Sequence, residues 1–239
     1  MSNLTNMNVV VTGGEGLLGK ACISAITEAG GTAISADISG GDVHIDIADE
    51  NSIKECVQGL VEKHGHIDGW INGAFPRTDD WGIKFEDVPS ESLRKNVDAH
   101  LNGYFLCCQN VLPVMKTQGK GSLINIGSIY GVTAPDFTVY EGTDMTSAAA
   151  YAAIKGGIVQ LTRYLAAYYG PDGVRVNTIS PGGIIDNQDP TFVKNYEAKT
   201  PLKRMGKPSD ISPAAVYLLS EDAAYVTGHN LVVDGGWSA

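Results

Sequence analysis

The chain alternates from end to end between short apolar, β-branched runs and longer segments in which apolar residues recur at helical spacing. The expected strands are residues 8–12, 32–36, 43–47, 68–72, 122–126, 174–179 and 230–233, and the expected helices include 17–28, 52–64, 90–114 (ended by Pro113), 148–169 and 210–219. Apolar strands separated by helices are typical of a parallel sheet covered on both faces. We therefore predict an α/β fold: one doubly wound domain over residues 1–239 with a seven-stranded parallel sheet.

Composition narrows the class of protein. Hydrophobic residues make up 43% of the chain, as in an ordinary globular domain, and we expect neither a membrane span nor a secretory leader. The net charge of −10 argues against a general nucleic-acid binder. The cysteines lie in apolar helical patterns, which indicates reduced thiols in a cytoplasmic protein: Cys22, Cys56, Cys107 and Cys108. His64 and His66 form a close pair without further ligands, so no metal is expected.

A glycine-rich turn follows the first expected strand. Residues 14–19 (GEGLLG) fit the pattern G-x-G-x-x-G and lead directly into an expected helix. Glycines at these positions let the backbone approach a pyrophosphate, and the helix N-terminus offers free N–H groups to the anion. The sequence therefore predicts a dinucleotide site, the alternative being a glycine-rich turn that binds nothing.

Asp37 lies at the end of the second expected strand. A carboxylate there accepts hydrogen bonds from the adenosine ribose and repels a 2′-phosphate. Glu15 adds a second negative charge in the neighbouring loop, and no Arg or Lys is expected beside either residue. These residues favour NAD over NADP, unless Asp37 only caps a turn.

Tyr151 and Lys155 are four residues apart and share one face of an expected helix. A lysine in that position lowers the pKa of the phenol, which then exchanges a proton with a substrate hydroxyl near neutral pH. Ser128, at the end of an expected strand, is placed to donate a hydrogen bond to the same substrate oxygen. These three residues are the candidate catalytic group.

Taken in order, these motifs resemble those of the compact short-chain dehydrogenase/reductase family over essentially the full chain. The resemblance is carried by residues 12–13 (TG), Gly19, Asp37, 46–47 (DI), Asn72, 125–128 (NIGS), Tyr151 with Lys155, 175–177 (RVN), 180–184 (SPGGI) and 232–236 (VVDGG). Around His100 and residues 135–155 the chain is similar to the flagellin-modification dehydrogenases of bacterial nonulosonate sugar pathways.

This resemblance implies a Rossmann-fold oxidoreductase that uses NAD and forms a homo-oligomer, a tetramer rather than a dimer. Tyr151 would be the general acid/base, Ser128 would orient the substrate oxygen, and Lys155 would also bind the nicotinamide ribose. The implied cofactor-binding residues are Gly13, Gly14, Gly16, Leu17, Leu18, Gly19, Asp37, Asp46, Ile47, Asn72, Gly73, Ala74, Tyr151, Lys155, Pro181, Gly182 and Ile184.

The chain departs from the family pattern at four places. Gly16 comes one position early in the glycine turn, and Asp186 replaces a threonine that usually contacts the carboxamide. His100 stands where an asparagine usually relays protons; it either takes over that role or is a core histidine bonded to backbone. The interval between Ser128 and Tyr151 is long, and the extra residues, 136–147, are either a substrate-gating loop or a solvated surface loop.

Residues near the expected mouth of the site are mostly polar: Arg77, Thr78, Asp79, Asp80 and Lys84, then 136–147. This favours a small polar substrate such as a sugar, sugar phosphate or sugar acid, whose anion Arg77 or Lys84 would bind unless these are surface charges. Two other functions stay open: a sugar epimerase or dehydratase that retains NAD, and a non-catalytic NAD(H)-binding regulator.

Overall fold

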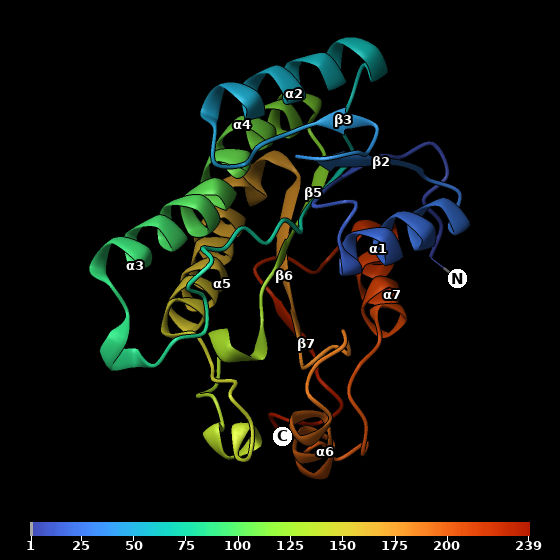
Figure 1. The fold of residues 1–239 in the computed structure, drawn as a ribbon. Coiled ribbons are helices and arrows are strands. Elements are labelled where there is room, and N and C mark those ends of the chain that lie inside the picture. Colours follow the sequence, from blue (N-terminus) through green and yellow to red (C-terminus); the bar gives the residue numbers. More distant parts are fainter. Residues whose placement is uncertain (1) are drawn as a thin grey trace.

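The computed structural model describes residues 2–239 and is built on a single parallel sheet (Figure 1). Its strand order is β3-β2-β1-β4-β5-β6-β7. The strands are β1 (Asn8–Thr12), β2 (Thr32–Asp37), β3 (Val43–His44), β4 (Gly69–Asn72), β5 (Gly121–Ile126), β6 (Val174–Pro181) and β7 (Asn230–Val233). The prediction of a seven-stranded parallel sheet is confirmed. Because the chain reverses its winding direction between β1 and β4, their carboxyl ends flank the crevice where ligands of such sheets bind.

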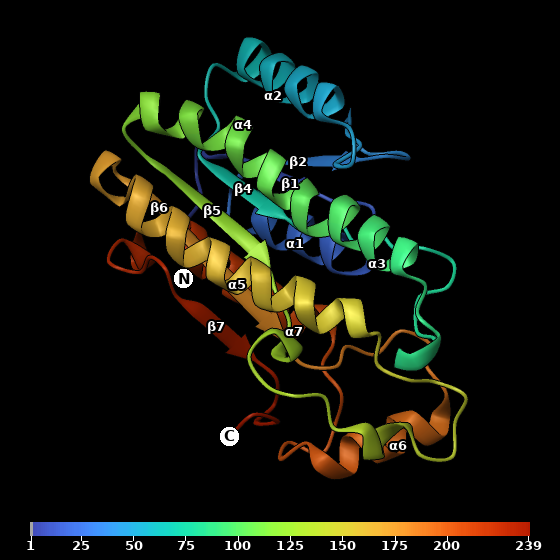
Figure 2. The same ribbon diagram turned by 90° about the vertical axis from the view of Figure 1, so that its left-hand side faces the viewer.

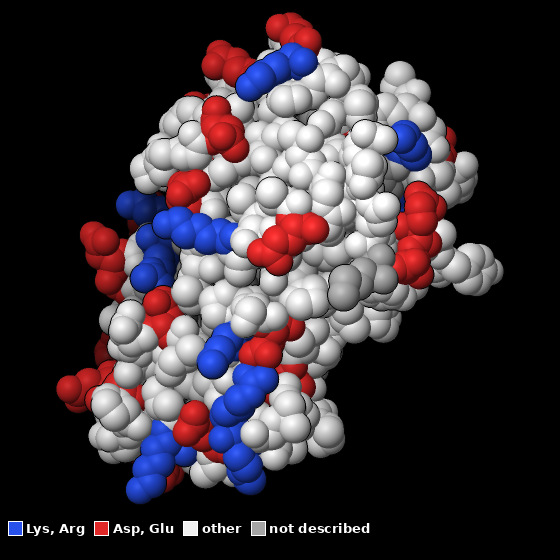
Figure 3. Space-filling view, turned by 90° about the vertical axis from the view of Figure 1, so that its right-hand side faces the viewer, with Lys and Arg blue, Asp and Glu red and all other residues white. Residues whose placement is uncertain are grey.

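Helices cover both faces of the sheet (Figures 1 and 2). The helices are α1 (Leu17–Glu28), α2 (Glu50–His64), α3 (Ser90–Asn96), α4 (Gly103–Gln118), α5 (Ala149–Tyr169), α6 (Pro190–Lys199) and α7 (Pro208–Leu219). α1 and α7 pack on one face, and α2, α4 and α5 lie side by side on the other. Over the face that carries α1 and α7, acidic and basic side chains are interspersed (Figure 3). Within residues 2–239, no helix is long and apolar enough to cross a membrane.

Each central strand contributes to two separate cores because successive side chains point to opposite faces. Val10 of β1 is buried beneath α2, α4 and α5, whereas its neighbours Val9 and Val11 are buried beneath α1 and α7. Leu123 and Ile124 of β5 divide in the same way. Helices on both faces therefore exclude water from the centre of the sheet. The ends of the strands stay accessible to a ligand.

The predicted helices are wrong in several places; α7, for example, begins at Pro208 rather than at residue 210. The 90–114 segment is not one regular helix: α3 and α4 are separated by a π-helical segment, Val97–Asn102, and α4 continues past Pro113 to Gln118. The burial of Leu112 and Met115 outweighs the hydrogen bond that Pro113 removes. α2 begins at Glu50, capped by the Asp49 carboxylate, and α6 lies in a segment for which no helix was expected.

Arg175 joins β6 to the end of α7. Its guanidinium donates to the carbonyl oxygens of Leu218 (2.7 Å), Leu219 (3.2 Å) and Ser220 (3.2 Å). The last carbonyls of a helix have no partners within the helix, so a side chain that supplies several donors at once stabilises that end. Arg175 of the RVN motif is therefore a structural residue, far from the strand ends that form the crevice.

We predict that Arg175→Met lowers the free energy of unfolding by about 1–3 kcal/mol, because partly buried carbonyls lose charged donors. Urea denaturation measures this loss. The matched control is Arg94→Met on the exposed end of α3, where we expect a change below about 0.5 kcal/mol. Equal effects of the two substitutions would contradict the capping role.

Candidate active site

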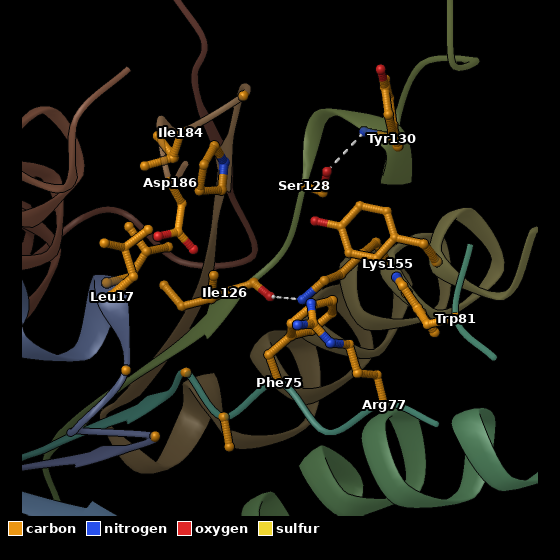
Figure 4. A pocket seen from close by; sticks show the side chains of 18 of the residues that line it. Leu17, Phe75, Arg77, Trp81, Ile126, Ser128, Tyr130, Lys155, Ile184 and Asp186 are labelled. Atoms are coloured by element: carbon orange, nitrogen blue, oxygen red, sulfur yellow. Dashed lines mark hydrogen bonds between the residues drawn. The ribbon is translucent and has the colours of Figure 1, made fainter. Parts of the chain in front are cut away.

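A cleft of about 1010 Å³ opens at the carboxyl ends of the strands (Figure 4). Residues from the loops after β1, β2, β4, β5 and β6 line it, together with α5 and the segment around α6. The predicted site residues that line this cleft are Gly13, Gly16, Leu17, Leu18, Gly19, Asp37, Asp46, Ile47, Gly73, Ala74, Ser128, Tyr151, Lys155, Pro181, Gly182 and Ile184. The structure thus brings together most of the residues expected from separate motifs.

The glycine turn forms one end of the cleft. Gly13 has a φ of 66°, and a side chain there would lie 2.7 Å from the Cα of Ala74, so only glycine fits between β1 and the loop after β4. A side chain at Gly19 would collide with the carbonyl oxygen of Gly13. Gly16 is the N-cap of α1, which has no capping side chain and no acidic residue in its first turn. This helix end is therefore open to an anion.

Gly14 does not belong to the cleft lining, contrary to the prediction. Its N–H donates to the carbonyl of Ala36 (3.3 Å), and a side chain at this position would collide with the Ser35 hydroxyl. The residue is glycine because β2 lies directly against it. Its role is to let the turn pack on the sheet.

Asp37 faces the adenosine end of the predicted cofactor site and also holds the loops around it. One carboxylate oxygen accepts the Glu15 N–H (3.1 Å) and the other accepts the Ser39 N–H (3.2 Å). A carboxylate has further acceptor capacity for ribose hydroxyls. The expectation that no cation lies nearby is wrong: Lys20, one helical turn further on, is 3.8 Å from the Glu15 carboxylate.

Tyr151, Ser128 and Lys155 meet in the middle of the cleft. α5 carries Tyr151 and Lys155 one turn apart. Figure 4 shows Lys155 beside the end of β5, which Ser128 follows. Lys155 is 2% exposed; its ammonium donates to the carbonyl of Ile126 (2.7 Å) and lies 5.7 Å from the centre of the Tyr151 ring. The phenol is thus set beside a serine hydroxyl and above a buried cation.

The pKa shifts of this group do not show the expected lowering of the Tyr151 pKa by Lys155. Burial raises the pKa of the Tyr151 phenol, and hydrogen bonding with Ser128 opposes that shift in part. Burial also lowers the pKa of Lys155 to about 7. Because the ammonium binds the strand carbonyl rather than the phenol oxygen, Lys155 does not lower the phenol pKa in this state. A bound cationic or anionic ligand would shift the pKa values of both Tyr151 and Lys155.

His100 lies behind Lys155, on the π-helical segment between α3 and α4. It is fully buried, and its Nε2 is 3.3 Å from the lysine Nζ. Because the ammonium has only donors, Nε2 is the acceptor, and the proton of the neutral ring is on Nδ1, which has no partner among the described residues. Burial, with the nearby Lys155 charge, lowers the histidine pKa to about 2.

Of the two interpretations of His100, the core histidine bonded to backbone is wrong, whereas the proton-relay role stays a prediction. The ring does not line the cleft, and it is not bonded to backbone; it contacts the catalytic-group lysine directly. π-Helical segments are frequent at functional sites because the extra residue redirects a side chain. No periodicity in the sequence signals this segment.

Asn72 is a second predicted cofactor-binding residue that does not line the cleft. It is fully buried under the cleft floor, where its side chain donates to Asn125 (2.9 Å) and accepts from the Trp70 indole (2.7 Å). These hydrogen bonds link β4 to β5 across the sheet. Asn72 therefore positions the strand ends, and its contact with a cofactor stays a prediction.

The 136–147 insertion covers the outer part of the cleft. It forms a 3-10 helical turn at Phe137–Tyr140, and Tyr140, Asp144, Met145 and Thr146 line the cavity. The insertion is attached to α6: Lys199 pairs with Asp136 (2.6 Å), and the Asn195 side chain donates to the carbonyls of Val139 and Glu141. We name the insertion and α6 together the roof. The insertion overhangs the site, as one of the two interpretations expected.

The cleft mouth is more aromatic than the sequence analysis predicts. Of the expected polar residues after β4, only Arg77 lines the cleft. Thr78 and Asp80 are instead bonded to Ser92 at the start of α3. The walls carry a set of rings that are not among the predicted catalytic or cofactor-binding residues: Phe75, Trp81, Tyr130, Tyr140, Phe192 and Tyr196.

These features together fit a dinucleotide. The open end of α1 suits a pyrophosphate, Asp37 suits a ribose diol, and the Lys155–Tyr151–Ser128 group lies further along the same cleft, where the reactive end of such a ligand would be placed. No group of three or more His, Cys, Asp or Glu side chains within residues 2–239 is arranged to hold a metal ion.

Comparisons with known proteins agree with this geometry. A family model described as enoyl-(acyl carrier protein) reductase matches residues 6–238. The flagellin modification protein A of Campylobacter coli is 36% identical over 98% of this chain and 99% of its own. A 2,5-dichloro-2,5-cyclohexadiene-1,4-diol dehydrogenase of Sphingobium indicum is 32% identical over the full length of both chains. The crystal structure of a Leptospira borgpetersenii short chain dehydrogenase with bound NAD+ superposes with a TM-score of 0.90, at 37% identity, covering 99% of this chain and 94% of that one.

We predict that His100 makes the fold sensitive to acid. The ring is neutral when folded, but in the unfolded chain it takes up a proton below about pH 6.5; stability is therefore present above that pH and is lost as the pH falls. From pH 6.5 to 4.5, the wild-type free energy of unfolding should fall more steeply than that of His100→Asn, by up to about 1.4 kcal/mol per pH unit.

Urea unfolding at several pH values measures the two slopes. Substitution of the exposed His44 by Asn is the control and should leave the wild-type slope unchanged. Parallel curves for wild type and His100→Asn would show that the buried ring is not neutral in the folded protein.

Proposed function

Because this chain belongs to the short-chain dehydrogenase/reductase family of oxidoreductases, we propose that it interconverts a secondary alcohol and a ketone with NAD(H) on a small polar substrate. The observation that carries the proposal is the placement of Tyr151, Ser128 and Lys155 in one cleft with the glycine turn. A phenol between a hydroxyl donor and a cation is suited to move a proton at a substrate oxygen. This favours turnover over a purely regulatory role.

In this proposal Tyr151 exchanges the proton of the substrate oxygen, and Ser128 holds that oxygen by a hydrogen bond. Lys155 binds the nicotinamide ribose hydroxyls, and in its protonated form it favours the phenolate that alcohol oxidation needs. NAD+, when bound, supplies the hydride acceptor at the nicotinamide and a positive charge of its own. The raised pKa of Tyr151 in the free protein is consistent with a phenol that becomes a base only in the complex.

We assign His100 a positioning role in the same reaction. Its Nε2 accepts from Lys155 and, with the Ile126 carbonyl, sets the direction of the ammonium. The neutral ring adds no second positive charge beside a lysine whose pKa burial already lowers to about 7. It therefore takes the structural place of the usual asparagine without acting as a proton carrier.

For the cofactor we propose NAD rather than NADP. The Asp37 carboxylate lines the adenosine end of the cleft and repels a 2′-phosphate. Lys20 of α1 is an opposing charge near this loop, but its pairing with Glu15 offsets it. A relative 37% identical in sequence is described with bound NAD+, which supports the same choice.

For the substrate we propose a ring alcohol of the sugar, sugar phosphate or sugar acid class. Aromatic side chains pack well against the C–H faces of such rings, and Asp144 and Asp186 line the cleft as acceptors for hydroxyl groups. The Sphingobium relative is named for a ring diol, and the Campylobacter relative for flagellin modification. An NAD-retaining epimerase or dehydratase would differ in forming no net NADH.

We further infer a homo-oligomer, with a tetramer favoured, in the cytoplasm. The outer surfaces of α4 and α5 leave Phe105, Tyr164 and Tyr168 exposed, and such aromatic patches are typical of subunit contacts. The four cysteines are buried free thiols, which fits a reducing compartment.

We predict that Tyr151→Phe lowers kcat by at least about 100-fold, because the substrate oxygen loses its proton donor and acceptor. NADH binding, measured by fluorescence titration, should stay within about threefold of wild type, since the ring remains. Substitution of the exposed Tyr225 by Phe is the matched control for both readouts. Retained turnover in the Tyr151 variant would disprove the assigned role.

We predict that Asp37→Asn raises the ratio of kcat/KM for NADP+ to that for NAD+ by at least about tenfold, because the repulsion of the 2′-phosphate is removed while an acceptor remains. Asn is preferred over Ala here since its carbonyl oxygen can keep the hydrogen bond from Glu15. Asp42→Asn, in the following turn, is the control. An unchanged ratio would rule out the ribose-binding role.

A further inference from the structure

Arg77 is a basic side chain that the proposed reaction does not use. It lies in the loop after β4, and its guanidinium carbon is 5.5 Å from the centre of the Phe75 ring. The side chain extends along that ring into the cleft, on the side opposite Asp186 and Ile184 (Figure 4). An arginine stacked on an aromatic ring keeps its planar donor groups in a defined orientation, which prepares it for a carboxylate or phosphate.

No acidic side chain neutralises this guanidinium. Although Asp79 and Asp80 follow closely in the sequence, no carboxylate within residues 2–239 lies within 4.0 Å of it. Asp80 is instead held by the Ser92 hydroxyl (2.8 Å). Only one other basic residue lines the cleft, Lys155, and its ammonium is buried and bonded. Arg77 is therefore the cation available to a ligand.

Three aromatic rings that contact one another line the cleft beside Arg77: Phe75, Trp81 and Tyr151. The centre of the Phe75 ring is 5.6 Å from that of Trp81 and 5.8 Å from that of Tyr151, and Trp81 and Tyr151 are 6.0 Å apart. All three pairs meet edge to face. Phe75 is 43% exposed although it lies inside a cleft, so a ligand ring would cover apolar surface there.

We propose that Arg77, Phe75 and Trp81 form a subsite for a ring substrate that carries an anionic group, either carboxylate or phosphate. The ring packs against Trp81 and Phe75 with its reacting carbon at Tyr151, and the anion binds the Arg77 guanidinium. Asp186 lines the opposite side of the cleft (Figure 4) and repels an anion, which favours Arg77 as its binding partner. This assignment rests on the proposed function and adds that the substrate carries a negative charge.

The test measures equilibrium binding of three pyranose probes to the NADH-loaded enzyme: galactose, galacturonate and galactose 6-phosphate. We expect wild type to bind at least one of the two anions about tenfold or more tightly than galactose, and the preferred anion identifies carboxylate or phosphate as the source. Arg77→Gln should reduce that advantage by about 10- to 100-fold, and Arg77→Lys by less, because a point charge remains without the planar fork.

Lys84→Gln is the matched control, since it removes the same charge from a nearby exposed residue outside the cleft lining. It should leave the preference for the anion intact. Equal binding of galactose and both anions by wild type would overturn the subsite, as would an Arg77→Gln variant that still prefers the anion.

NAD+ reduction by the same probes separates this proposal from the proposed function. If wild type prefers an anion in the binding assay but no probe or other ring alcohol yields NADH, the dehydrogenase assignment fails and the subsite stands. If NADH forms but Arg77→Gln lowers kcat/KM equally for galactose and for the anions, the subsite fails and the dehydrogenase assignment stands.

Discussion

The hydrogen bond from the buried Lys155 ammonium to the Ile126 carbonyl is the contact around which the site is organised. An ammonium in the interior is costly unless its donors find acceptors. Here one acceptor is the last residue of β5 and another is His100, so the position of the lysine depends on the sheet end and on the π-helical segment together. The pKa of Lys155 is lowered because burial makes its charged form less favourable. The residues around Lys155 therefore depend on one another for their positions.

The sequence is sufficient for the fold because its signals are local and mutually consistent. The β-branched run of residues 8–12 (NVVVT), the glycines behind it and the helical spacing after Leu17 each predict the structure that forms. A parallel sheet then brings the strand ends to one edge, so Asp37, Ser128 and Tyr151 are expected in one cleft without any knowledge of their contacts. Gly16 at the N-cap of α1 shows that the altered glycine spacing still gives an open helix end.

The parts that could not be predicted depend on contacts between distant segments. His100 and Lys155 are 55 residues apart, and only the packing of the π-helical segment against α5 decides that they touch. Asn72 and Gly14 match the family pattern in type, but the contacts that they make in the structure are with residues of the sheet. The aromatic walls come from segments far apart in sequence, so neither periodicity nor a motif reveals them.

The roof is assembled from two pieces of chain that share a small core of their own. Val139 of the insertion packs with Phe192 and Tyr196 of α6 and with Met205, while the Asp136–Lys199 pair joins the outer edge. A change of substrate range by mutation or by loop grafting must therefore alter both pieces at once, since a foreign insertion would leave the apolar side of α6 without its counterpart. In related chains, we expect a change in one of these two segments to be accompanied by a change in the other.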